Sequence, residues 1–240
     1  NNAFGGKREC TKRIKAFEAD WARLQSDVPG WPVDATDRAF HAKLIEWLRL
    51  HESILIGELV PLALHHLRSN PTSAELTAYD HVIVDEYQDL NKAEQALINL
   101  ISENASLSIV GDEDQSIYSF RHANPQGIVE FNQVHNTTHD ETLAECRRCP
   151  TLVVGLANNL ILNNHPGVQN ARLLPLAGNP IGTVKVVQWQ GMDEEIQGIA
   201  DYVNHLVSNE NVNPGDILIL TSRRVIGYGI RDHIAQHNVP

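Results

Sequence analysis

Two acidic clusters, each placed directly after a short apolar run, are the residues of this sequence best suited to chemistry. The run 82–84 ends in Asp85 and Glu86. At the end of a buried strand, one such carboxylate can hold Mg²⁺, directly or through a water ligand, while the next polarises a water that attacks a γ-phosphate. The alternative is that this acidic turn only caps a helix that begins near Asn91.

The second cluster lies at 111–121 and also follows an apolar run. It combines acidic residues with the amide of Gln115, the aromatic rings of Tyr118 and Phe120, and Arg121. The amide suits contact with a phosphate, and aromatic rings offer faces on which single-stranded bases stack, at roughly 1–3 kcal/mol per base. The alternative is that both rings belong to the core and that Arg121 forms a surface ion pair.

The surrounding sequence predicts a scaffold that brings the two clusters together. Short apolar runs at 82–84 and 107–110 flank a helical segment, and this alternation is typical of a parallel α/β sheet. Ligands bind at the carboxyl ends of such strands, which is where both clusters fall. Apolar spacing predicts helices through most of 1–75, with a cap at Thr36, and a further helix after Pro125.

A second alternation follows a polar stretch at 132–140, which marks the expected boundary between two lobes. Its elements are a strand near 142–143, a helix at 150–163, a strand at 183–189, a helix at 193–206, a strand at 216–220 and a helix at about 225–237. We therefore predict a helical region at 1–75, an α/β region at 76–140 and a second α/β region at 141–240.

Composition narrows the classes of protein that this chain can belong to. The 240 residues carry nineteen Lys and Arg against thirty Asp and Glu, a formal charge of −11, so any contact with nucleic acid must be local. No apolar window reaches the length of a membrane helix, and the start of the chain has no signal-peptide core. Both absences predict a cytoplasmic protein without a membrane partner. Three cysteines are too few for a disulfide scaffold, which agrees with a reducing compartment.

The two clusters together resemble a known family. VIVDEYQDLN followed by IVGDEDQSIYSFRHA is similar to motifs II and III of the superfamily 1 DNA helicases of the UvrD/Rep/PcrA type. TLAECRRCPTLVVGLANNLI, at 142–161, resembles the motif IV region, and DILILTSRR, at 216–224, resembles a strand of the second lobe. The resemblance implies two partial P-loop NTPase (RecA-like) lobes, with parallel sheets flanked by helices. The region 1–75 would belong to subdomain 1B, 76–140 to lobe 1A and 141–240 to lobe 2A.

The resemblance also implies an activity and its partners. It suggests part of an ATP-dependent DNA helicase that moves 3′ to 5′ on single-stranded DNA with ATP and Mg²⁺ and acts on single-stranded and partially duplex DNA. It further implies a nucleoid-associated place in a bacterial-type cytoplasm and a role in repair, replication or recombination.

The resemblance also implies roles for individual residues. Asp85 would serve Mg²⁺, Glu86 would be the catalytic base and Gln115 would read the γ-phosphate. Gln88, beside the attacking water or the neighbouring lobe, and Arg121 would couple the nucleotide site to the DNA-stacking rings of Tyr118 and Phe120. Arg147, aligned with the arginine of motif IV, would reach the γ-phosphate from the second lobe when the lobes close.

Two departures from the family pattern matter. The tyrosine that stacks on adenine in the family aligns with Cys146, and a thiol offers no stacking face. The phosphate-binding loop GxxxxGK[ST] is absent from the 240 residues, and the nearest approach, Gly5-Gly6-Lys7-Arg8, lacks the first glycine and the hydroxyl. We therefore expect an internal fragment of a helicase that does not hydrolyse ATP on its own.

Two other functions remain open on the sequence. One is a naturally degenerate helicase-like module that binds DNA or a partner without turnover. The other is a thiol oxidoreductase, because Cys146 and Cys149 form a CxxC motif at the junction of a strand and a helix, where a helix N-terminus and two arginines favour thiolates.

Overall fold

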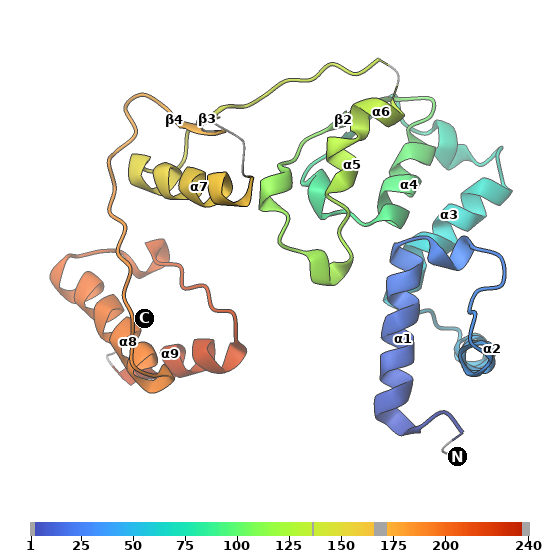
Figure 1. The fold of residues 1–240 in the computed structure, drawn as a ribbon, viewed down its shortest axis with the longest axis horizontal. Helices are drawn as coiled ribbons and strands as arrows, with labels where there is room; N and C mark the ends of the chain where they lie inside the picture. Colours follow the sequence, from blue (N-terminus) through green and yellow to red (C-terminus); the bar gives the residue numbers. More distant parts are fainter. Residues whose placement is uncertain (1–2, 136, 166–171, 237–240) are drawn as a thin grey trace. The chain divides into compact units, whose positions relative to one another are not determined.

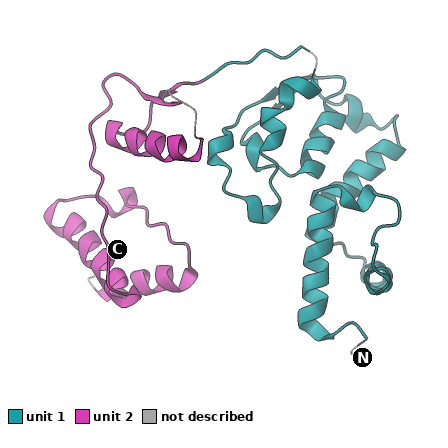
Figure 2. Ribbon diagram, in the orientation of Figure 1, with its two compact units in different colours: residues 1–142 teal, residues 143–240 magenta. Residues whose placement is uncertain are grey.

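The computed structural model describes residues 3–135, 137–165 and 172–236. The chain divides into two compact units, residues 1–142 and 143–240, shown in different colours in Figure 2. This division falls two residues after the boundary expected from the polar stretch. The assignment of the regions to helicase subdomains stays a prediction.

Unit 1 begins with three helices, visible in blue to cyan in Figure 1: α1 (Gly6–Ala22), α2 (Ala35–Leu50) and α3 (Leu59–Ser69). The cap of α2 is Asp34, whose carboxylate accepts hydrogen bonds from the amides of Thr36 and Asp37. The prediction of a cap at Thr36 was therefore wrong by two residues, because the aspartate carboxylate serves both amides. Pro61 lies in the first turn of α3, where its missing N–H costs no helical bond.

An aromatic core joins α1 to α2. Phe17, Trp21 and Phe40 are buried together, and Trp31 packs on the edge of Phe17 with 5.4 Å between ring centroids. The Trp31 indole nitrogen donates a hydrogen bond to Asp20, at 2.8 Å. This core fixes α1 and α2 against each other.

The strands expected beside the acidic clusters form a two-stranded parallel sheet. β1 (His81–Val84) pairs with β2 (Ser106–Ile109) in the register His81↔Ser106 through Val84↔Ile109, and α4 (Lys92–Ile101) connects them. The parallel arrangement predicted from the sequence is confirmed for this pair. Both strands end at the same edge of the sheet, so the residues that follow them lie near one another.

Short elements complete unit 1. Three 3₁₀ helices, at Tyr87–Asp89, Glu113–Gln115 and Ser119–Arg121, follow or carry the residues of the two clusters, and Asp85 and Glu86 directly precede the first of them. After Pro125 the chain forms two four-residue helices, α5 (Gln126–Val129) and α6 (Phe131–Val134), in place of one longer helix.

The described residues of unit 2 form a second, smaller parallel pair and three α-helices. β3 (Glu145–Cys146) pairs with β4 (Leu174–Pro175), and α7 (Thr151–Asn164) lies between them in the sequence. α8 (Met192–Asn209) and α9 (Arg224–Gln236) pack against each other through buried residues such as Ala200 and Ile230. The three helices confirm the expected ones, although residue 237, the expected end of the last, lies outside the described residues.

Of the three strands predicted after the polar stretch, one is displaced and two were wrong. The strand expected near 142–143 lies at Glu145–Cys146, and the segments 183–189 and 216–220 are irregular, apart from a 3₁₀ turn at Pro214–Asp216. A β-branched run has the propensity for a strand, but a strand also needs a neighbouring backbone to accept its hydrogen bonds. Neither segment pairs with another backbone in the described part of the chain, and Val186, Leu218 and Leu220 are at least 80% exposed.

The protein is therefore a mixed α/β chain that is mostly helical and contains small parallel sheets. Among the described residues, none of the helices combines the length and the apolar character required to cross a lipid bilayer.

Candidate active site

The end of β1 delivers two exposed carboxylates. Asp85 and Glu86 follow Val84 directly, and the Asp85 carboxylate accepts the backbone N–H of Glu86 at 2.9 Å. Glu86 adopts a left-handed backbone conformation, with φ 52° and ψ 41°. This conformation is uncommon for a residue with a side chain, and it turns the chain sharply at the edge of the sheet.

The acidic turn does not cap the helix that follows it. The first turn of α4 is capped by Asn91, whose side chain accepts the amide of Glu94, while the Glu94 carboxylate accepts the amide of Asn91. Because this capping box satisfies the helix end, the purely structural role considered for Asp85 and Glu86 does not account for them. Their carboxylates remain at the strand end, where chemistry is expected.

Gln88 is the buried centre of the site. Its side chain is 1% exposed, and its amide nitrogen donates to the Glu86 carboxylate at 2.7 Å. Its amide oxygen accepts the backbone N–H of Asp112, the acid that follows β2, at 3.1 Å. One buried side chain therefore joins the turn after β1 to the turn after β2. A buried amide that uses both of its polar ends fixes the position of both partners.

Asp112 extends this connection to Gln115. One carboxylate oxygen of Asp112 accepts the amide of Asp114 at 3.0 Å, and the other accepts the side-chain nitrogen of Gln115 at 2.8 Å. The result is a continuous series of hydrogen bonds from Glu86 through Gln88 and Asp112 to Gln115. We call this series the strand-end network. It brings the candidate base and the candidate phosphate-sensing amide into one cluster.

Gly111 makes the strand-end network possible by its lack of a side chain. A Cβ atom at this position would lie 2.4 Å from the Gln88 amide oxygen and 2.9 Å from the Ile128 side chain. Tyr87 beside it is buried, and burial raises the pKa of its phenol. The sequence analysis did not single out Gly111, although a glycine directly before an acid at a strand end is the available signal.

The aromatic residues of the second cluster lie together on the surface. The rings of Tyr118 and Phe120 meet at 61° with 5.7 Å between centroids, and the Arg121 guanidinium lies over the Tyr118 ring at 5.8 Å. Phe120 is 73% exposed, so the alternative that both rings belong to the core fails for this residue. The three side chains form one group at the surface, the exposed group, in which Phe120 and Arg121 are exposed and Tyr118 is half-buried.

A second buried amide anchors the segment that carries these rings. Gln95 on α4 is 7% exposed, and its nitrogen donates to the Asn124 backbone oxygen at 2.9 Å. The Asn124 side chain donates back to the Gln95 oxygen at 2.7 Å, and the Asn124 amide donates to Leu90 at 2.7 Å. Sequence reasoning missed both residues, because a buried Gln gives no signal until its partner is known.

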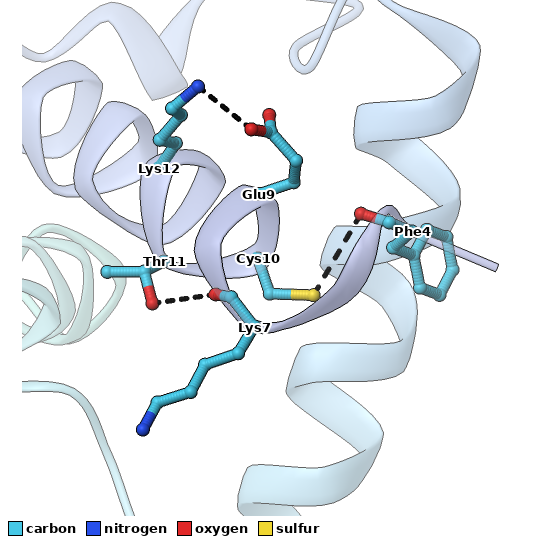
Figure 3. Close-up of polar contacts among 6 residues, drawn as sticks. All are labelled: Phe4, Lys7, Glu9, Cys10, Thr11 and Lys12. Atoms are coloured by element: carbon cyan, nitrogen blue, oxygen red, sulfur yellow. Dashed lines mark hydrogen bonds and ion pairs between the residues drawn. The ribbon is translucent and has the colours of Figure 1, made fainter. Parts of the chain in front are cut away.

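Two parts of the sequence considered for contact with phosphate lie outside the strand-end network. Arg147 belongs to unit 2, where it is exposed in the turn between β3 and α7, and its proposed role stays a prediction. The Gly5-Gly6-Lys7-Arg8 segment opens α1, and the Thr11 hydroxyl donates to the Lys7 backbone oxygen at 2.9 Å, as Figure 3 shows. The described residues before this helix contain no strand, so the segment has none of the setting of a phosphate-binding loop.

The donors at the strand end fit a magnesium ion of the kind that accompanies a nucleotide. The described residues contain no group of three or more His, Cys, Asp or Glu that could enclose a metal. Magnesium in nucleotide sites needs only one or two carboxylates, because phosphate and water oxygens supply the other ligands. The exposed Asp85 carboxylate, with one oxygen held by a single amide, meets that need.

Comparison with known proteins decides the family. A family model described as the UvrD/REP helicase N-terminal domain matches residues 12–136, which is more than half of the chain and includes the whole strand-end network. The chain belongs to the UvrD/REP helicase family. The matched range ends before Arg147, so the family assignment rests on unit 1.

Individual helicases of the family share parts of this sequence. It is 24% identical to the ATP-dependent DNA helicase PcrA of Leuconostoc citreum over 86% of this chain and 29% of that protein. It is 32% identical to UvrD1 of Mycobacterium leprae over 69% of this chain and 22% of that protein. It is 32% identical to Rep of Buchnera aphidicola over 58% of this chain and 21% of that protein. The chain thus spans less than a third of the length of these relatives.

Proposed function

We propose that this chain forms the central part of an ATP-dependent DNA helicase, with the strand-end network as one side of its ATP site. The observation that carries the proposal is the buried Gln88 amide, which holds the Glu86 carboxylate and the Asp112 amide at once. The proposal includes two RecA-like lobes, one in each unit. The relatives named above are ATP-dependent DNA helicases, which supports the choice of nucleotide and partner.

In this proposal Glu86 is the general base for hydrolysis. Its carboxylate would accept a proton from the water that attacks the γ-phosphate, while the hydrogen bond from Gln88 keeps it aimed at that water. Asp85 would hold Mg²⁺, which supplies charge neutralisation on the phosphate oxygens when bound. Gln115, oriented by Asp112, would donate its amide hydrogens to the γ-phosphate.

The exposed group of Tyr118, Phe120 and Arg121 is the proposed link to DNA. Phe120 presents an open face on which a single-stranded base can stack, and the Arg121 guanidinium lies over the neighbouring Tyr118 ring. In the whole helicase, this group would contact the single strand at the junction with duplex DNA, and translocation would run 3′ to 5′.

Arg147 is the proposed contribution of unit 2. An arginine supplied from a second lobe stabilises the transition-state charge only when the lobes close on the nucleotide. Closure and opening would then couple each ATP hydrolysed to one step along the strand. We also propose that the 240-residue chain alone does not turn over ATP, since the loop that cradles the phosphates is absent from this sequence.

The proposal is tested by Glu86→Gln in the intact helicase. Loss of the base should lower kcat for DNA-stimulated ATP hydrolysis by about 10²–10⁴-fold, while binding of Mg-ATP, followed by a fluorescent nucleotide, is retained. Glu103→Gln is the matched control, because Glu103 is an exposed glutamate two residues past the end of α4. This variant should hydrolyse ATP like the unaltered enzyme.

Two results would contradict the proposal. Full hydrolysis by the Glu86→Gln variant would mean that another residue is the base. Absence of hydrolysis in the unaltered intact protein, with DNA binding retained, would favour a degenerate helicase-like module that binds without turnover.

A further inference from the structure

A turn of sequence Cys146-Arg147-Arg148-Cys149 connects β3 to α7 and carries two of the three cysteines. Cys146 is the last residue of β3, and its backbone oxygen accepts the amide of Leu176 at 3.1 Å. Cys149 precedes Pro150, the residue at the start of α7. Both thiols are free and half-buried, and the two arginines between them are exposed.

One side chain holds both ends of this turn. The amide nitrogen of Asn179 donates to the backbone oxygen of Cys146 at 2.8 Å and to that of Cys149 at 2.9 Å. Both cysteine backbones are therefore tied to the same group. A fixed backbone lowers the entropic cost of bringing the two sulfur atoms together, because the turn does not need to be ordered first.

The neighbouring segment also closes the start of the helix. The amides of Thr151 and Leu152 donate to the backbone oxygens of Pro180 and Ile181, at 2.9 Å and 3.0 Å. Gly182 allows this approach, since a Cβ atom there would lie 2.3 Å from the Pro150 side chain. The first two amides of α7 therefore already have hydrogen-bond partners, so the start of this helix does not offer an open site for an anion.

The two sulfur atoms interact directly with the turn and with each other. The amide of Cys149 donates to the Cys146 sulfur at 3.4 Å. Hydrogen bonds from the Cys149 and Arg148 backbones lower the pKa of Cys146, and the hydrogen bond to Cys146 raises the pKa of Cys149. Cys146 is thus the more acidic thiol of the pair, and Cys149 is the one that donates a hydrogen bond to it.

We propose that Cys146 and Cys149 form a redox-active dithiol that hydrogen peroxide converts into an intrachain disulfide. The Cys146 thiolate attacks one peroxide oxygen, the O–O bond breaks, and a sulfenic acid and hydroxide form. The Cys149 sulfur then attacks the sulfenic sulfur, an S–S bond forms, and the hydroxyl leaves as water with the Cys149 proton. Two thiols are oxidised, and one peroxide is reduced to two waters once the hydroxide takes up a proton.

A metal site is the other chemistry open to such a pair, and the structure disfavours it. Structural zinc takes four ligands, and the described residues contain no third His, Cys, Asp or Glu grouped with the two thiols. Two thiols held beside each other, with one more acidic than the other, suit oxidation.

Cys10 provides an internal control. It is half-buried like the other two, but its thiol points to the backbone oxygen of Phe4, at 4.0 Å, as Figure 3 shows. Its hydrogen-bond partner is a backbone carbonyl oxygen and not a second thiol. Differences in reaction between Cys10 and the pair therefore do not come from exposure alone.

The test uses the fully reduced 240-residue chain and one molar equivalent of hydrogen peroxide. Peptide mapping by mass spectrometry should find Cys146 joined to Cys149, with Cys10 still a thiol, and dithiothreitol should restore all three thiols. Cys149→Ser should stop at a sulfenic acid on Cys146, which dimedone labels. Cys146→Ser should abolish the disulfide and slow peroxide consumption several-fold, whereas Cys10→Ser should change neither.

Three results would overturn the proposal. The first is that both cysteines of the pair stay reduced, or pass to sulfinic acid without a disulfide, while Cys10 reacts as fast. The second is a disulfide that includes Cys10. The third is stoichiometric binding of Zn²⁺ by the reduced chain that is lost in the Cys146→Ser variant. The first two results are read by mapping the unaltered chain, so they do not depend on whether the variants fold.

Discussion

The turns after β1 and β3 each lead from a parallel strand towards a helix, but they are held in place differently. After β1, a buried side chain, Gln88, lies inside the turn and uses both ends of its amide. After β3, the side chain of Asn179 reaches in from a distant segment and binds only backbone oxygens. The first arrangement orients the proposed catalytic carboxylate, whereas the second fixes the backbone of the proposed redox-active dithiol.

The difference shows how similar local geometry serves different chemistry. A carboxylate that acts as a base must be aimed, so its hydrogen-bond partner has to be positioned as well. A dithiol needs two sulfur atoms within reach, and a fixed backbone is sufficient for that. Substitutions that remove one support at a time should therefore have different effects in the two turns.

The largest effect is expected from Gln88→Met in the intact helicase. Methionine fills a similar volume but releases both Glu86 and the Asp112 amide, so kcat for ATP hydrolysis should fall by about 100-fold, the effect of a misplaced catalytic group. The measurement is steady-state phosphate release with saturating DNA.

Gln95→Met is the matched control for this prediction. Gln95 is also a buried amide of unit 1, but it anchors Asn124 and not the acidic turn. Both variants leave buried polar groups unpaired, at a cost of roughly 1–3 kcal/mol of stability. An equal loss of kcat in the two variants would mean that Gln88 acts through stability alone.

The next largest effect is expected from Gly182→Ala, which should destabilise the turn after β3. Its φ of 73° costs an L residue roughly 1–2 kcal/mol, and the clash with Pro150 adds about 1–3 kcal/mol. Hydrogen exchange at the Thr151 and Leu152 amides should accelerate accordingly. Gly155→Ala, in the open interior of α7, should instead slow exchange, because alanine favours the helix by about 0.5–1 kcal/mol.

Gly111→Ala should loosen the turn after β1 by a smaller amount. No positive φ is involved, so the destabilisation comes from steric contact alone, with the Gln88 oxygen, Ile128 and the Tyr87 backbone nitrogen, at about 1–3 kcal/mol. Exchange of the Asp112 amide, which donates to Gln88, should report the change. Unchanged protection at Asp112 would show that Gln88 can move away without loss of the strand-end network.

The smallest expected effect is a dependence of the stability of unit 1 on pH. Burial lowers the pKa of His41 in unit 1, against the opposing charge of Glu58. The contribution of neutral His41 to stability is fully present above the usual histidine pKa of about 6.5. It is lost as the pH falls through the lowered pKa of His41 in the folded state. Acidification from about pH 7.5 to about pH 5.5 should therefore weaken unit 1.

Tryptophan fluorescence during urea unfolding measures this effect, because Trp21 and Trp31 contact His41. His41→Phe keeps an aromatic ring without a titrating group, so its unfolding midpoint should depend less on pH over this range. An identical pH dependence in the variant would assign the effect to other groups.

The sequence predicts those features that depend on local pattern. The strands His81–Val84 and Ser106–Ile109 follow from apolar runs that end in acid or glycine, and the helices of unit 2 follow from their apolar spacing. The segments 183–189 and 216–220 carry the same kind of signal but remain irregular, because a strand depends on a partner that the local pattern does not specify.

The side chains that hold the two turns in place could not be predicted either, and the reason is related. Gln88 is a polar residue whose burial is stable only because Glu86 and Asp112 satisfy its amide, and Asp112 lies 24 positions away. Asn179 lies 33 positions from Cys146. The reactive residues stand out by type and spacing, whereas the residues that orient them become visible only from their contacts.

The most direct test of the central claim is a double-mutant cycle between Gln88→Met and Gln115→Ala in the intact helicase, read by single-turnover ATP hydrolysis. If the strand-end network links Glu86 to Gln115, the two losses should not add, and the coupling should be about 0.5–3 kcal/mol. Losses that add to within roughly 0.3–0.5 kcal/mol would show that the two acidic clusters act independently, and would contradict the account of a single site.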